Sequence, residues 1–184
     1  MPHSTGTDAV ITAVRRWLET VVIGLNLCPF AARELRLERI RFAVTSATTE
    51  TQVSQRLRSE LQRLDSEPDI ETTLLILPDA LQKFGDYNNF LDTAENLLKT
   101  MDMEGIYQIA SFHPHYQFAG TRASDAENYT NRSPYPVLHL LREASLEKSI
   151  ARYPDVNQIP QRNIALMQQL NTDHLEALLR ACFV

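Results

Sequence analysis

The sequence lacks the features that identify several common classes of protein. Its 184 residues include only two cysteines, Cys28 and Cys182, too few for the disulfide framework of a small secreted protein. No apolar run approaches the roughly 20 residues that a membrane-spanning helix requires. The first ten residues, MPHSTGTDAV, lack the basic and apolar regions of a secretory signal. These absences predict a cytoplasmic protein without a membrane span.

Excess positive charge and phosphate-binding motifs are also missing. The formal net charge is −5, whereas non-specific binding to nucleic acid or to an anionic membrane requires a basic surface. Neither GxGxxG nor GxxxxGK[ST] occurs, which argues against dinucleotide and P-loop nucleotide binding, and GxSxG and HExxH are absent as well. We therefore expect a small molecule or another protein as the partner, with no nucleic acid and no membrane. No sequence feature specifies a homodimer, although one is compatible with every function considered below.

Strand and helix patterns alternate along the chain. Thr49 and Gln52 have the spacing of a capping box at a helix start, and Gly24 is expected to end the first helix in a left-handed conformation. Pro136 is expected to begin a helix that contains His139 as a half-buried structural histidine. Short apolar segments predict strands at 39–45, 72–77 and 106–112, and amphipathic segments predict helices at 8–23, 49–64, 88–103, from 136 past 141, 159–170 and 173–182.

This alternation predicts an α/β fold in a single compact domain, residues 1–184, with 1–7 as a loose tail. We expect a small three- or four-stranded sheet, largely parallel, packed with helices and followed by a helical C-terminus. An α+β sandwich with an antiparallel sheet is the alternative. Parallel strands would gather Ser46, Thr48, Asp79 and His113 at one edge of the sheet, where open sheets usually bind ligands.

Four segments carry a resemblance to a known family: LNLCPF (25–30), FGDYNNFL (84–91), YQIASFHPHYQFAGT (107–121) and ENYTNRSPYPVLHLLREAS (127–145). Together they resemble an uncharacterised family of bacterial proteins, a domain of unknown function, across nearly the whole chain. The resemblance implies no activity, ligand or catalytic residue.

His113, Pro114 and His115 follow the predicted third strand. Residues two apart in an extended segment share a face, so both imidazoles could bind one divalent metal ion such as zinc, with Asp125 as a third ligand. Without a metal, His113 could act as a general acid or base with His115, Asp125 or Glu127 as partner. Alternatively, the histidines hydrogen-bond loop carbonyls and Asp125 caps a turn.

The loop 113–135 is rich in groups that bind anions. Arginine side chains grip carboxylate or phosphate, and the free N–H groups at a helix start attract negative charge. A ring stacked on Tyr129 would add apolar contact. The alternative is that the arginines pair with acidic residues and brace the loop. The candidate ligand-binding residues are Arg122, Asn128, Tyr129, Asn131, Arg132 and Arg142.

Cys28 precedes Pro29 at the expected start of a short helix, where a thiol can have a lowered pKa. With His113 or His115 nearby it could be a nucleophile that one of these histidines activates as a base. The alternative is that Cys28 is a buried residue that serves packing.

Two classes of function follow, and the sequence leaves open whether the chain is an enzyme. One is a hydrolase or general acid/base enzyme acting on a small anionic metabolite that bears phosphate or carboxylate. The other is a non-catalytic module that binds a small ligand or a protein, with the loop 113–135 as a structural recognition surface.

Overall fold

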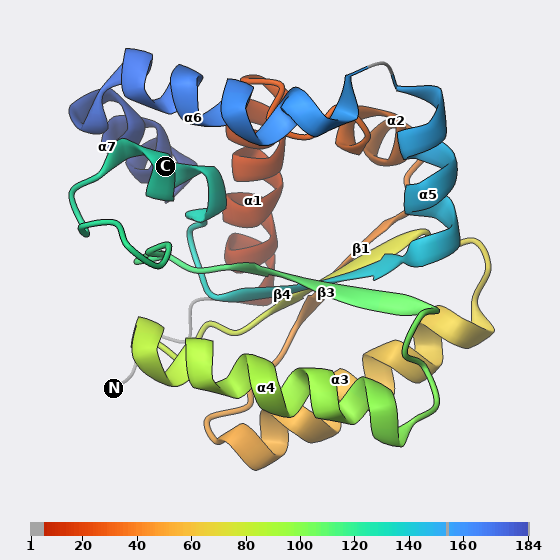
Figure 1. The fold of residues 1–184 in the computed structure, drawn as a ribbon. Coiled ribbons are helices and arrows are strands. Elements are labelled where there is room, and N and C mark those ends of the chain that lie inside the picture. The colour runs from red at the N-terminus through yellow and green to blue at the C-terminus, as the bar shows by residue number, and fades with distance from the viewer. Residues whose placement is uncertain (1–5, 154, 184) are drawn as a thin grey trace.

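A four-stranded sheet in the order β1-β2-β4-β3 forms the centre of the computed structural model, which describes residues 6–153 and 155–183 (Figure 1). β1 (Ile40–Val44) and β2 (Thr72–Ile76) are parallel, whereas β4 (Val137–Arg142) is antiparallel to both β2 and β3 (Tyr107–Phe112). The predicted mixed α/β fold with a small sheet and a helical C-terminus is confirmed. The expectation of a largely parallel sheet is wrong.

The segment after Pro136 causes this difference, because it forms a strand and not the expected helix. The buried residues of β4, Val137, Leu138 and Leu140, lie on both faces of the strand, so its sequence VLHLLR lacks the alternation that distinguishes a half-buried strand from a helix. Pro136 stands just before the strand, where its missing N–H is tolerated, and its carbonyl accepts a hydrogen bond from Leu77 N at 2.9 Å. β4 thereby pairs with both β2 and β3.

Helices cover both faces of the sheet, and Figure 1 shows α3 and α4 on one side with α1 and the C-terminal helices on the other. Two further helices, α2 and α5, lie on the same side as α1. The helices are α1 (Thr7–Trp17), α2 (Ala31–Arg36), α3 (Glu50–Ser66), α4 (Phe84–Thr100), α5 (Glu143–Arg152), α6 (Ile159–Leu170) and α7 (Thr172–Arg180), with the π-helix η1 (Leu18–Ile23) and the 3₁₀ segments η2 (Ala126–Asn131), η3 (Val156–Gln158) and η4 (Ala181–Phe183).

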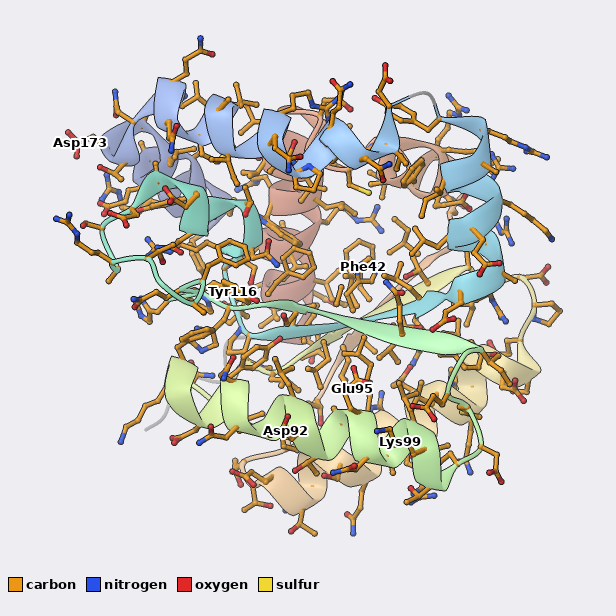
Figure 2. The ribbon with its side chains drawn as sticks, in the orientation of Figure 1. Phe42, Asp92, Glu95, Lys99, Tyr116 and Asp173 are labelled. Carbon is orange, nitrogen blue, oxygen red and sulfur yellow. The ribbon has the colours of Figure 1, made fainter. Side chains whose placement is uncertain are left out.

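Alternate residues of β2 separate two apolar cores. Leu75 packs with α3 and α4, whereas Leu74 and Ile76 pack with α1 and η1. Successive side chains of a strand point to opposite faces, so β2 contributes to both cores and all its residues are buried. Figure 2 shows Phe42 of β1 on the same side of the sheet as α1.

The helix starts and ends were predicted with mixed success. Thr49 caps α3 as expected, since its hydroxyl accepts from Gln52 N at 3.3 Å. Gly24 does not adopt the expected left-handed conformation, because its φ is −59°. It is required for another reason: a Cβ atom there would overlap the carbonyl oxygen of Thr20 in the preceding π-helical turn.

The N-terminal tail expected at residues 1–7 lies largely outside the described residues, and α1 already begins at Thr7. Among the helices that the structure describes, none is long and apolar enough to cross a membrane.

Candidate functional site

His113 is fully buried at the end of β3, and both of its ring nitrogens bond to backbone. Nδ1 accepts from the N–H of His115 at 3.0 Å, so the proton lies on Nε2, which donates to the carbonyl of Leu81 at 3.1 Å. The ring packs against Phe84 and Tyr87, with centroids 5.4 and 5.1 Å away. Burial lowers the pKa of His113 to about 4. The imidazole is therefore neutral near pH 7 and has no free nitrogen.

His115 is exposed, with its ring centroid 6.0 Å from that of His113. Asp125 uses Oδ2 to accept the backbone N–H of Arg122 at 2.8 Å, and Glu127 lies in η2 and is half-buried. In residues 6–153 and 155–183, no three His, Cys, Asp or Glu side chains form a group that could hold a metal ion. The expected ligand set of His113, His115 and Asp125 is thus not assembled.

Asn128 is fully buried and holds the loop 113–135 together. Its Oδ1 accepts from Phe118 N and from the hydroxyl of Thr121, both at 2.9 Å, and its Nδ2 donates to the carbonyl of Arg122 at 2.7 Å. Asn131 plays a similar part, because its Nδ2 donates to Ser111 O at 3.0 Å. Both amides that were expected to bind ligand thus carry loop hydrogen bonds.

Arg132 and Tyr129 form a second brace. The guanidinium of Arg132 lies over the Tyr129 ring at 4.2 Å from its centroid and donates to the carbonyls of Ala123 and Tyr116. Figure 2 shows Tyr116 in the segment that follows β3. Arg122 is exposed. Arg132 thus braces the loop through backbone carbonyls, and within the described residues neither it nor Arg122 forms the ion pairs that the sequence suggested as the alternative.

Arg142 lies at the far end of β4 from this loop. Its guanidinium donates to the carbonyl of Leu64 in the last turn of α3, to the carbonyl of Ile70 shortly before β2, and to the hydroxyl of Tyr107. Arginine beside the last carbonyls of a helix stabilises that end. The structure does not bring Arg142 together with Arg122 and Arg132.

A cavity of about 240 Å³ lies on the other face of the sheet, between β2, β3, β4 and the helices α1, η1, α2 and α5. Its walls are mainly apolar and its rim carries charged and hydroxyl groups. The lining residues are Trp17, Leu18, Val22, Cys28, Phe30, Ala31, Glu34, Ile40, Glu71, Thr72, Leu74, Ala110, Phe112, His139, Leu141, Arg142, Ser145, Leu146 and Ser149.

His139 forms part of the floor of this cavity, because it faces the same side of the sheet as Leu74 and Ala110, its partners in the strand register. Its Nε2 lies 2.7 Å from the hydroxyl oxygen of Thr72, which in turn donates to the carbonyl of Leu140 at 2.6 Å. Burial lowers the pKa of His139 to about 4. The imidazole is neutral near pH 7.

Cys28 lines the same cavity and is half-buried. Burial raises the pKa of its thiol, while the nearby backbone N–H groups of Phe30 and Ala31 act in the opposite direction. Cys28 packs with the core beside α1, whereas the rings that enclose His113 belong to the α4 side. His139, and not His113 or His115, is the histidine that shares a cavity with Cys28 among the described residues.

The rim of the cavity contains an ion-paired cluster. Arg39 bonds to Glu71 at 2.6 Å and reaches Glu34 at 3.4 Å, and both carboxylates belong to the cavity lining. The two glutamate side chains are largely buried, with exposed fractions of 15% and 13%. Arg33 also pairs with Glu34, so two arginines face the two carboxylates and the cluster is balanced in charge.

The sequence model of the family described as "Protein of unknown function (DUF1415)" matches residues 9–177. The chain belongs to this family. The expected membership in a domain of unknown function is therefore confirmed, and the matched span contains the whole lining of the cavity. No curated protein and no solved structure is significantly similar to the chain.

Thr72 and His139 line the cavity but were not predicted as site residues from the sequence. The residues that line the cavity from β4 are His139, Leu141 and Arg142. A period of two through 137–141 would have put His139 on one face of a strand with Val137 and Leu141. Because VLHLLR lacks the alternation of a half-buried strand, its sequence did not distinguish this arrangement from the expected helix.

Proposed function

We propose that the protein binds a small, mainly apolar molecule in the cavity between the sheet and α1, α2 and α5. The observation that carries this proposal is a space of about 240 Å³, lined mainly by apolar side chains, against the centre of the sheet. Ligand sites are typically concave and mostly apolar, with a few polar groups that orient the ligand. An engineered apolar cavity of about 150 Å³ already holds benzene. The space here suits a molecule of one or two rings.

The packing around the cavity supports the same conclusion. Protein interiors contain few voids larger than a water molecule, because unfilled apolar space forfeits dispersion contacts. Elsewhere both cores contain fully buried side chains, such as Leu57, Leu75 and Met167. A ligand in the cavity would restore the missing contacts.

The π-helical turn of η1 is a second supporting feature. Leu18 and Val22 of this segment line the cavity, and the turn is closed by the i→i−5 bond from Gly24 N to Glu19 O at 3.0 Å. π-helical turns occur frequently at functional sites, since they are less stable than a regular helix and persist where they shape a site. Here the π turn shapes the cavity wall.

The hydrolase hypothesis stays a prediction and has weaker support. It assigns chemistry to His113, whose ring nitrogens are both occupied by backbone groups. The alternative, in which the loop 113–135 is structural and the protein binds without turnover, agrees better with the bonds made by Asn128, Asn131 and Arg132.

Trp17 provides the test, because it is the single tryptophan of the chain and lines the cavity. Its fluorescence should change on titration with toluene or naphthalene. Ala110→Leu, which adds bulk at the cavity floor, should abolish the change, whereas Ala144→Leu on the exposed face of α5 should not. Unchanged fluorescence, with no shift in the NMR spectrum of the wild-type protein, would rule out this function.

A further inference from the structure

We infer that the ligand of this cavity carries a neutral hydroxyl or N–H group that donates a hydrogen bond to Nδ1 of His139. This inference rests on the proposed function and names the chemistry of its ligand. It assigns a binding role to an imidazole at the floor of a mainly apolar space.

The hydroxyl of Thr72 determines which nitrogen of His139 carries the proton. A hydroxyl has one proton, and a carbonyl oxygen can only accept. The Thr72 oxygen lies 2.6 Å from the carbonyl oxygen of Leu140, a distance at which two oxygens without an intervening proton repel each other. The Thr72 proton is therefore used in this bond.

It follows that Thr72 accepts the second bond. The 2.7 Å contact between its oxygen and Nε2 of His139 requires a proton on Nε2. A neutral imidazole has only one such proton, so Nδ1 is an acceptor with a free lone pair. Placing the proton on Nδ1 instead would leave one of the two short contacts of Thr72 without a proton.

Nδ1 has no hydrogen-bond partner in the part of the chain that the structure describes, although the ring lines the cavity. Among the described side chains, the atoms that lack a partner and are also fully enclosed by protein are Arg56 Nε, Thr73 Oγ1 and Asn163 Oδ1. Nδ1 of His139 is not one of them, so this atom is accessible. β4 has a paired strand on each side, so the space that Nδ1 can reach is the cavity. An acceptor in apolar surroundings selects a ligand that supplies a donor, because leaving it unpaired is unfavourable.

The walls define the remainder of the ligand. Trp17, Leu74 and Phe112 surround the space with rings and aliphatic groups, which favour an aromatic body. A charged ammonium donor would lose its hydration here, which disfavours it. The low pKa of His139 keeps the imidazole an acceptor near pH 7. A phenol or an N–H heteroaromatic molecule meets all these conditions.

Matched pairs of molecules test the inference by NMR titration of the ¹⁵N-labelled protein. Phenol and toluene have the same shape but differ in the donor, as do indole and indene. We expect phenol and indole to bind about tenfold more tightly than their partners, as one hydrogen bond of typical strength provides. In His139→Phe, which keeps an aromatic ring but removes the acceptor, this preference should fall to about one.

The outcomes distinguish the two proposals. Equal binding of both members of each pair would leave the apolar cavity as a binding site and overturn the donor requirement. No binding of any of the four molecules would overturn the proposed function itself. Because His139→Phe removes the N–H that donates to Thr72 and could fail to fold, the proton position is also measured in the wild-type protein. An imidazole ¹⁵N spectrum with the proton on Nδ1 would contradict the inference independently of any variant.

Discussion

The imidazole of His113 accepts a hydrogen bond from the backbone N–H of His115, with 3.0 Å between N and Nδ1. The two residues therefore interact as ring with backbone, and not as two rings that face a common ligand. This bond, with the second one to Leu81, makes His113 the connection between the end of β3 and the segment that precedes α4.

Acid should destabilise the protein in the pH range between 6.5 and 4. The pKa values of His113 and His139 are lowered to about 4 in the folded state, whereas an unfolded chain binds these protons near pH 6.5. Stability is therefore complete above pH 6.5 and falls as the pH decreases towards 4. Each histidine contributes up to about 1.4 kcal/mol per pH unit.

Urea unfolding at pH 7.0, 6.0 and 5.0 measures this slope. His139→Phe should reduce it by about half, because one of the two buried neutral imidazoles is removed. A free energy of unfolding that does not change between pH 7 and pH 5 would show that both histidines become protonated in the folded protein.

Substituting alanine for Gly24 and for Gly85 should change the stability of the protein in opposite directions. Gly24→Ala places a methyl group against the Thr20 carbonyl oxygen and should destabilise the protein by about 1–3 kcal/mol. Gly85, in the first turn of α4, has open space around it, so Gly85→Ala should stabilise by about 0.4–1 kcal/mol. Thermal unfolding of both variants checks the pair, and equal shifts in melting temperature would contradict the tight π-helical turn.

Asn128→Ala should destabilise the loop 113–135. The substitution removes three hydrogen bonds and leaves Phe118 N and the Arg122 carbonyl without their partner, at a cost of about 2–4 kcal/mol. Asn89→Ala, on the exposed side of α4, is the matched control and should change stability by less than about 0.5 kcal/mol. Hydrogen exchange at the amide of Phe118 would locate the effect, and unaltered protection there would disprove it.

Cys28 should react slowly with iodoacetamide at pH 8. Its thiol is half-buried and burial raises its pKa, so the thiolate fraction is small. We expect alkylation at least about tenfold slower than in the urea-unfolded chain, as measured by mass spectrometry of the Cys28 peptide. A rate above that of the unfolded chain would restore Cys28 as a nucleophile, with His139 as its neighbour in the cavity.

The features that local patterns determine were predictable. The cap at Thr49 depends on a hydroxyl and a residue three positions later, and the strands at 72–76 and 107–112 are short apolar segments with flanking turn residues. These signals arise within a few residues, so the sequence contains all the information that they need.

The segment 137–142 could not be assigned in this way. Its choice between helix and strand depends on β2 and β3, which come from distant parts of the chain and each offer an edge of backbone groups to it. The site shares this dependence, because residues from Trp17 to Ser149 form one cavity. His113 was singled out as a candidate base or metal ligand, whereas the backbone bond of its Nε2 depends on a contact with Leu81, 32 positions away.

The position of β4 also sets the order in which the sheet can be completed during synthesis. Of the four strands in this sheet β4 is synthesised last, yet it occupies an inner place, between β2 and β3. Until residues 137–142 emerge, the nascent chain holds a parallel pair and an unpaired third strand whose open edges invite pairing with other chains. β4 pairs with the facing edges of both β2 and β3, and its residue His139 completes the floor of the cavity.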